Sequence, residues 1–363
     1  MKNFFNPFFF CLFLYNATGF TSEVILPSPT GPYQVGTQAI EMKDSSRKML
    51  RDSDGRRWMI QAFYPTPAST AQLYPYMPGT LENGMIKDVK VLVHSQPNAS
   101  LLTQKPLPVI IFIPGFGGER QKYTLLCEEL ASHGYVVLSF DQPHVSNFVR
   151  FSSGDEIVVT LKDLWKMRDR DYRYQYYDEA MAAAIADITY LLNNFQPFNQ
   201  TYFKGFLDEK RIVLMGHSFG GNVAHTLGFT EPRIKAIVDI DSKITERKIY
   251  GRVGVPLNPL GKPVLFVRAI KQYQEDVGNQ LSKIKEATIF PLDVQHSAFA
   301  DTAYLVQKIA ALKSTNDWDH FMNWLFKKGP HFDSIDTNLG PYSADEWTKL
   351  YRLQIVKWLK TIK

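Results

Sequence analysis

One stretch, residues 211–227, constrains the fold more than any other part of the chain. Its four apolar residues starting at Ile212 are typical of a strand that is buried on both faces. Gly216-His-Ser-Phe-Gly220 interrupts that run, and a helical pattern follows. Strand, Gly-x-Ser-x-Gly and helix together predict a nucleophile elbow, a sharp turn that presents a serine above the sheet. Ser218 is therefore the candidate nucleophile, and a glycine-rich turn with an idle serine is the alternative.

The glycines of this motif fit the same turn. Side chains at Gly216 and Gly220 would collide with the neighbouring strand and helix, whereas glycine has no side chain to collide. The strained backbone at Ser218 costs on the order of 1–3 kcal/mol. The first N–H groups of the following helix have no partner within that helix and point toward the reacting centre. We therefore expect the N–H of Phe219 to bind the oxyanion.

A second apolar strand, residues 107–113, runs into Pro114-Gly-Phe-Gly-Gly118. Glycines at this place let the backbone itself approach a substrate. Proteins with a nucleophile elbow take their second oxyanion donor from the loop after such a strand, so we assign it to the N–H of Phe116. An ordinary strand-to-helix turn is the alternative, because the same residues suit that turn as well.

The other predicted elements alternate along the chain as in α/β proteins. We expect a mostly parallel central sheet, an antiparallel N-terminal hairpin and helices on both faces, all within one domain of residues 20–363. The predicted strands are 38–50, 56–64, 135–140, 234–241, 262–268 and 287–292, and the predicted helices are 123–133, 177–192, 304–312 and 344–359.

A serine hydroxyl is a weak nucleophile, so it needs a base, and the base needs a carboxylate that orients it. After an elbow these groups follow in the order serine, carboxylate and histidine, each in a loop after a strand. Asp241 ends the predicted strand 234–241, and His296 follows the predicted strand 287–292. The sequence therefore predicts a catalytic set of Ser218, Asp241 and His296.

Each member of this set except the serine has a competitor. Asp239 lies on the same strand face as Asp241, and strand-end position favours Asp241. His320 and His331 also come after the acid, but neither follows a strand. The histidines beside the elbow, His217 and His225, are interpreted as packing or capping groups.

The first 19 residues differ in composition from the rest of the chain. Lys2 gives a basic start, residues 4–15 are mostly apolar, and Ala17-Thr-Gly19 offers small residues for cleavage. This pattern is typical of a secretory signal peptide and is too short for a membrane span. We expect residues 1–19 to be removed and the protein to be secreted, extracellular or periplasmic. The mature chain would hold one cysteine, Cys127, and so no intramolecular disulfide.

Charge and composition exclude several function classes. The 363 residues carry a formal charge of +5 from 41 basic and 36 acidic side chains, spread without a dominant block. This balance gives no argument for nucleic-acid binding and only a weak attraction to anionic surfaces. The eight histidines form no cluster with metal-ligand spacing. We therefore expect neither a metal nor another cofactor.

Residues 145–172 break the α/β alternation. They combine basic, acidic and aromatic side chains. At the edge of the ligand crevice such a segment forms a lip over the pocket or contacts lipid, and a plain solvated helix is the alternative.

These residues make the chain resemble the plasma-type platelet-activating factor acetylhydrolases, which are calcium-independent serine phospholipases of the α/β-hydrolase fold. The resemblance rests on the spacing of the predicted catalytic set and on four motifs, Gly31-Pro-Tyr-Gln-Val-Gly36, Gly216-His-Ser-Phe-Gly-Gly221, His296-x-x-Phe-Ala-Asp301 and Ser334-Ile-Asp-Thr-Asn338. It implies a secreted serine ester hydrolase that releases short or oxidised acyl chains from phospholipids through an acyl-enzyme.

The chain also departs from that family near its pocket. Ser242 and Lys243 stand where the family has alanine and tryptophan, and Pro114 stands where it usually has histidine. The acyl preference therefore stays open, as does the oligomeric state. The alternatives are a broad carboxylesterase or polyester hydrolase acting on small esters, and a catalytically inactive binding protein with the α/β-hydrolase fold.

Overall fold

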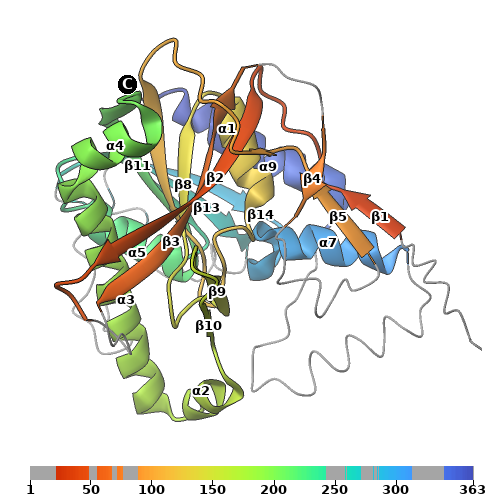
Figure 1. Ribbon diagram of the computed structural model, residues 1–363. Coiled ribbons are helices and arrows are strands. Elements are labelled where there is room, and N and C mark those ends of the chain that lie inside the picture. The colour runs from red at the N-terminus through yellow and green to blue at the C-terminus, as the bar shows by residue number, and fades with distance from the viewer. Residues whose placement is uncertain are drawn as a thin grey trace, which may run out of the picture.

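Figure 1 shows a computed structural model of the protein. It describes residues 22–48, 55–67, 72–76, 89–242, 258, 260–270, 281, 284, 286–312 and 339–362. The predicted signal peptide 1–19, Lys243, His320, His331 and the motif at 334–338 lie outside the described residues. The domain boundaries drawn from the sequence stay predictions.

A large mixed sheet forms the centre of the described part of the chain, in the order β14-β13-β12-β11-β7-β8-β3-β2-β6. The strands from β14 to β8 are mutually parallel, which confirms the predicted mostly parallel α/β fold. β3 runs antiparallel to both β8 and β2. The bounds are β2 (Gln34–Asp44), β3 (Arg56–Thr66), β6 (Gln96–Pro97), β7 (Leu107–Ile113), β8 (Val136–Phe140), β11 (Leu207–His217), β12 (Ile234–Ile240), β13 (Val264–Ala269) and β14 (Ala287–Leu292).

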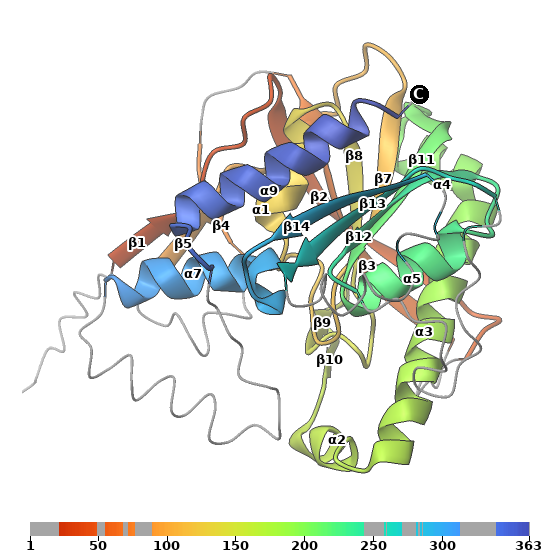
Figure 2. The same ribbon diagram turned by 180° about the vertical axis from the view of Figure 1, so that it is seen from behind.

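Helices cover both faces of this sheet (Figures 1 and 2). One face packs against α1 (Thr124–Ser132), α7 (Asp301–Ala310) and α9 (Ala344–Leu359), and the other against α3 (Arg170–Asn193), α4 (Phe195–Phe203) and α5 (Phe219–Gly228). β7 is apolar throughout because it is buried on both faces of the sheet. Ile110 and Phe112 belong to the first core and Val109 and Ile111 to the second, because successive side chains of a strand point to opposite faces.

Smaller elements lie at the margins of this core. β1 (Ser22–Ile25), β5 (Val89–Val93) and β4 (Tyr74–Pro75) form a separate sheet. β9 (Phe148–Arg150) pairs antiparallel with β10 (Glu156–Val158), and α2 (Leu161–Lys166) and the 3₁₀ helix η2 (His296–Phe299) are short. No described helix is both long and apolar enough to cross a membrane.

Several elements differ from their predicted bounds by a few residues, and two of the larger differences have local reasons. α3 begins at Arg170 rather than at 177, because the Asp169 carboxylate accepts the Tyr172 N–H at 2.7 Å and caps the helix earlier. β2 ends at Asp44 rather than at residue 50, because the Asp44 carboxylate accepts the Ser46 N–H at 3.0 Å and turns the chain.

Candidate active site

The elbow lies between β11 and α5. Ser218 has φ 53° and ψ −115°, a left-handed backbone that non-glycine residues rarely adopt. Its N–H donates to the Ile240 carbonyl at 2.8 Å, which ties the turn to the end of β12. The nucleophile predicted from the sequence therefore occupies a strained turn at the carboxyl end of the parallel strands, where α/β sheets place ligands.

Close backbone packing accounts for the two motif glycines. A Cβ on Gly216 would lie 2.2 Å from the Gly220 carbonyl, and a Cβ on Gly220 would lie 1.8 Å from the Ile113 carbonyl oxygen. Both distances are impossible for a real Cβ, and both neighbours are backbone. Either substitution would force β7, β11 and α5 apart at the point where Ser218 is presented.

Asp241 and His296 are in direct contact. The Nδ1 of His296 lies 2.6 Å from Oδ2 of Asp241, while Oδ1 of Asp241 accepts the Ala269 N–H at 2.8 Å. A carboxylate only accepts, so Nδ1 carries the proton and Nε2 is left to accept one. Asp241 is 1% exposed, whereas the His296 side chain is 52% exposed. This orientation is the one that a general base requires.

The strand register brings the acid next to the nucleophile. His217 pairs with Ile240 across β11 and β12, so Ser218 and Asp241 follow at the same level. The His217 and His296 rings lie 4.7 Å apart, which places His296 against the residue before the serine. No hydrogen bond between Ser218 and His296 occurs among the described residues. Catalytic hydrogen bonds are often long in free enzymes and tighten when substrate binds.

Asp239, the competing acid, has different partners. Its carboxylate accepts from Arg268 Nη1 at 2.8 Å, from His225 Nδ1 at 2.9 Å, and from both the N–H and the hydroxyl of Ser242. These four bonds use the acceptor sites of a carboxylate. Burial raises the pKa of Asp239, but Arg268 and His225 outweigh it and hold the pKa well below its usual range. Asp239 therefore binds Ser242, the residue after Asp241, and does not orient His296.

The predicted oxyanion donors lie close to the serine. A Cβ on Gly115 would lie 3.5 Å from the Ser218 Cβ, so this loop passes directly against the nucleophile. The Phe116 and Phe219 rings lie 6.0 Å apart. Within the described part of the chain neither of these residues donates its N–H to an acceptor. Both donors are therefore available to a developing negative charge.

A tyrosine that the sequence did not indicate completes one wall of the site. The Tyr177 ring, from α3, lies 5.1 Å from the Phe219 ring and stacks on Phe116 at 6.1 Å. Its hydroxyl accepts the Asn222 amide N–H at 2.9 Å. Tyr177 is separated from the elbow by about 40 residues of sequence, so no local pattern indicates this contact.

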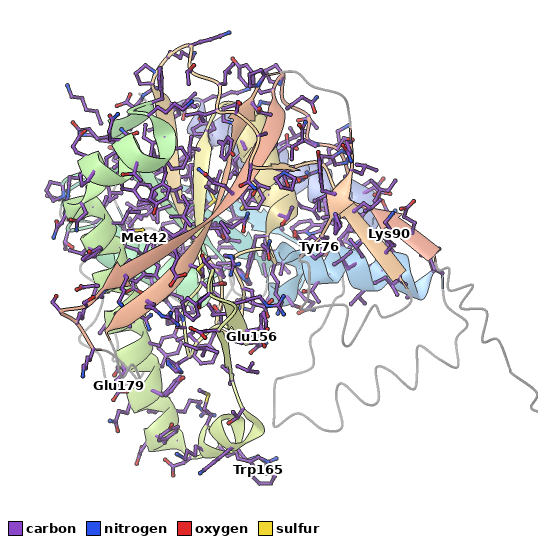
Figure 3. All side chains as sticks on the ribbon, viewed as in Figure 1. Met42, Tyr76, Lys90, Glu156, Trp165 and Glu179 are labelled. Atoms are coloured by element: carbon purple, nitrogen blue, oxygen red, sulfur yellow. The ribbon has the colours of Figure 1, made fainter. Side chains whose placement is uncertain are left out.

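Residues 145–172 begin at the site and end far from it. Val145 accepts the Gly117 N–H at 3.1 Å, and Asn147 donates to the Gly117 carbonyl at 3.3 Å, so the segment starts on the oxyanion loop. α2 lies at the far tip of α3 (Figure 1). Trp165, which is 59% exposed, points outward there (Figure 3).

No group of metal-ligating side chains is present in the described ranges.

Comparison with known proteins places the chain. Residues 110–356, more than half of the chain, match the alpha/beta hydrolase family, and residues 18–157 match "platelet-activating factor acetylhydrolase, isoform II". A "probable 1-alkyl-2-acetylglycerophosphocholine esterase" of Arthroderma benhamiae is 25% identical over 62% of this chain and 60% of its own length. The platelet-activating factor acetylhydrolase of Bos taurus is 25% identical over 58% of this chain and 52% of its own length.

The match thus spans only about half the length of the curated relatives. Among solved structures, a ferulic acid esterase from Streptomyces cinnamoneus is similar with a TM-score of 0.67, 20% identity and 93% coverage of both chains, which shows the fold alone. The protein belongs to the α/β hydrolase family, and its residues 18–157 are similar to the platelet-activating factor acetylhydrolases.

Proposed function

We propose that this protein is a serine ester hydrolase that releases short or oxidised acyl chains from phospholipids. The observation that carries the proposal is the 2.6 Å contact between Asp241 and His296 beside a serine with φ 53°. A carboxylate, a correctly oriented imidazole and a strained serine at one end of a parallel sheet form a constellation that activates a hydroxyl for acyl transfer.

The reaction follows from these positions. The Ser218 Oγ attacks the acyl carbonyl while His296 Nε2 takes its proton, and Asp241 stabilises the imidazolium that forms. The N–H groups of Phe116 and Phe219 bind the oxyanion, and one such donor contributes about 3–4 kcal/mol to transition-state stabilisation. His296 returns the proton to the leaving alcohol. Water then attacks the acyl-enzyme, with His296 again as the base, and releases the acid.

Similarity to the platelet-activating factor acetylhydrolases supports phospholipid as the substrate class. The Arthroderma benhamiae relative is named as a probable esterase of a 1-alkyl-2-acetylglycerophosphocholine. A panel of phospholipids with short, oxidised and long sn-2 chains, run beside p-nitrophenyl esters, tests this choice. Preference for short-chain phospholipids supports the proposal. Equal or faster turnover of simple esters would instead favour a broad carboxylesterase or polyester hydrolase.

Ser218→Ala tests the chemistry itself. We expect it to reduce kcat by at least about 10³-fold, because the nucleophile is lost. Wild-type protein should bind a fluorophosphonate probe covalently and the variant should not. A wild-type protein that neither reacts with the probe nor hydrolyses any ester of the panel would instead be an inactive binding protein.

Exposed apolar side chains at the end of β10 and in α2 support contact with a lipid surface. Val158 and Trp165 are 52% and 59% exposed, and the Arg168 guanidinium lies 3.7 Å from the Trp165 ring centre. Exposed tryptophan beside basic side chains is typical of residues that insert into the headgroup region of anionic membranes.

Vesicle binding tests this contact. Trp165→Ala should lower partitioning to vesicles of phosphatidylcholine and phosphatidylserine by about tenfold, since burial of a large apolar side chain contributes about 1.5–3 kcal/mol. Leu260→Ala is the control, because Leu260 is 50% exposed and precedes β13, at the amino end of a parallel strand. Equal vesicle binding by both variants would exclude Trp165 from the lipid contact.

Secretion is also part of the proposal, and a mature N-terminus at Phe20 in exported protein would support it.

A further inference from the structure

One buried hydroxyl contacts two of the segments that meet at the candidate active site. Tyr123 directly precedes α1 and is 3% exposed. Its Oη accepts the Gly115 N–H at 3.1 Å and lies 2.8 Å from Nδ1 of His217. Gly115 is the residue before Phe116, and His217 is the residue before Ser218. The hydroxyl therefore joins the oxyanion loop to the elbow.

The direction of each hydrogen bond in this chain follows from the groups present. The Gly115 N–H can only donate, so the Tyr123 hydroxyl accepts there and has its own proton left for His217. Nδ1 of His217 therefore accepts. The other ring nitrogen, Nε2, then carries the proton and donates it to the main-chain carbonyl of His296 at 3.0 Å. Tyr123 thus sets the tautomer with which His217 holds the base loop.

His217 is a fixed hydrogen-bond donor and does not take part in proton transfer. Burial lowers the pKa of His217 to about 3, and the neighbouring His296 contributes in the same direction. The ring therefore stays neutral wherever His296 acts as a base. A neutral His217 also avoids placing a positive charge 4.7 Å from the imidazolium that forms on His296.

A second set of contacts joins the start of α1, next to Tyr123, to the loop that carries His296. The Asp301 N–H donates to the Lys122 carbonyl at 2.9 Å, and the Asp301 carboxylate accepts the Leu125 N–H at 3.3 Å. The Phe299 ring, between His296 and Asp301, packs 5.7 Å from the His217 ring. The start of α1 thus contacts the base loop on both sides of Tyr123.

We propose that Tyr123 and His217 are positioning residues that fix the Phe116 N–H, Ser218 and His296 relative to one another through a Gly115–Tyr123–His217–His296 chain of hydrogen bonds. The proposal rests on the proposed function, because it assigns roles within that reaction. A displacement of 1 Å among reacting groups can cost about 100-fold in rate, so a chain that joins all three segments acts on kcat.

Tyr123→Phe tests the hydroxyl alone. The variant keeps the ring and its packing against Phe112, whose centroid lies 4.8 Å away, but leaves the Gly115 N–H and His217 Nδ1 without a partner. We expect kcat to fall by about 10- to 100-fold with KM changed by less than about threefold. Fluorophosphonate labelling should slow by a similar factor.

Tyr64→Phe is the matched control. Tyr64 is also 3% exposed, and its hydroxyl donates to the Ala99 carbonyl at 2.8 Å, away from the elbow. Both variants lose a buried hydrogen bond, so both should lower the melting temperature, but only Tyr123→Phe should lower kcat. Equal kcat losses in the two variants, or a kcat of Tyr123→Phe within about twofold of wild type, would overturn the proposal.

His217 itself gives a rescue test and a spectroscopic one. His217→Gln retains an amide donor for the His296 carbonyl and should keep more activity than His217→Leu, and equal activities would count against the proposal. Long-range ¹⁵N–¹H spectra of the wild-type protein at about pH 5 should show a neutral His217 protonated at Nε2. A protonated ring or an Nδ1–H tautomer would overturn the proposal. These spectra decide the hydrogen-bond chain even if no ester is hydrolysed.

Discussion

Asp239 and Asp241 are two residues apart on one strand end, and both are almost fully buried. Asp239 is surrounded by four hydrogen bonds from buried groups, including the Arg268 guanidinium. Asp241 gives one oxygen to the Ala269 N–H and the other to His296, which is half exposed. Both carboxylates are buried, so their partners distinguish the candidate for chemistry from the one that holds the structure.

β13 makes this division possible. Its last two residues are Arg268, which binds Asp239, and Ala269, whose N–H binds Asp241. Ser242 completes the arrangement by donating its N–H to Asp239 at 3.0 Å. The serine that replaces the alanine of the resembling family is thus part of the cluster around Asp239.

Asp241→Asn should give the largest effect on catalysis. An asparagine keeps the shape of the side chain but favours the wrong tautomer of His296, so we expect kcat to fall by about 10⁴-fold. The melting temperature should change little. Steady-state kinetics and thermal unfolding of the same preparation check both statements. A decrease in kcat of less than about tenfold would indicate that another residue is the catalytic acid.

Asp239→Asn should reverse that pattern. It leaves Arg268 buried without its carboxylate, and breaking a buried ion pair typically costs about 3–5 kcal/mol of unfolding free energy. The kcat of the folded protein should stay within about tenfold of wild type. Urea unfolding with activity measured below the transition separates the two quantities, and a loss of activity without a loss of stability would contradict the comparison.

The same variant should change the acid stability of the protein. Because the folded pKa of Asp239 lies below the unfolded value, its contribution is fully present above the unfolded pKa, near 3.8, and is lost as pH falls through the folded pKa. Wild-type protein therefore keeps this contribution at neutral pH and loses it in strong acid. The stability difference between wild type and Asp239→Asn should narrow below about pH 4, as measured by urea unfolding across pH.

Ser242→Ala should give the smallest effect. It removes the hydroxyl donor to Asp239 but keeps the main-chain N–H, so we expect a loss of about 1 kcal/mol in unfolding free energy. Turnover should stay within about threefold of wild type. A large kcat loss here would show that the Asp239 cluster also governs the geometry of Asp241.

The sequence was sufficient for the features that depend on local pattern. The buried strand, the motif glycines and the helix after Ser218 predict the elbow. The alternation of strands and helices along the chain predicts a mostly parallel sheet. α4 was missed because Pro197 interrupts its pattern, although proline is tolerated in the first turn of a helix. The choice between Asp239 and Asp241 depended only on strand-end position, since their partners come from β13, α5 and the loop of His296.

Long-range hydrogen bonds set the limit of what the sequence could predict. His217 and His225 were both interpreted as packing or capping groups. The structure gives each a specific partner, Tyr123 for His217 and Asp239 for His225. Tyr123 is 94 residues from His217, and neither residue type nor spacing indicates that contact.

Ser218 and Asp241 both have positive φ, 53° and 50°, at the ends of adjacent parallel strands. Glycine would adopt either conformation without penalty. A copy of this protein released from selection for catalysis would therefore relieve backbone strain by mutating the two residues that the proposed reaction needs. Glycine at these two positions in a descendant chain would mark a lost enzyme, even where the fold and every other motif survive.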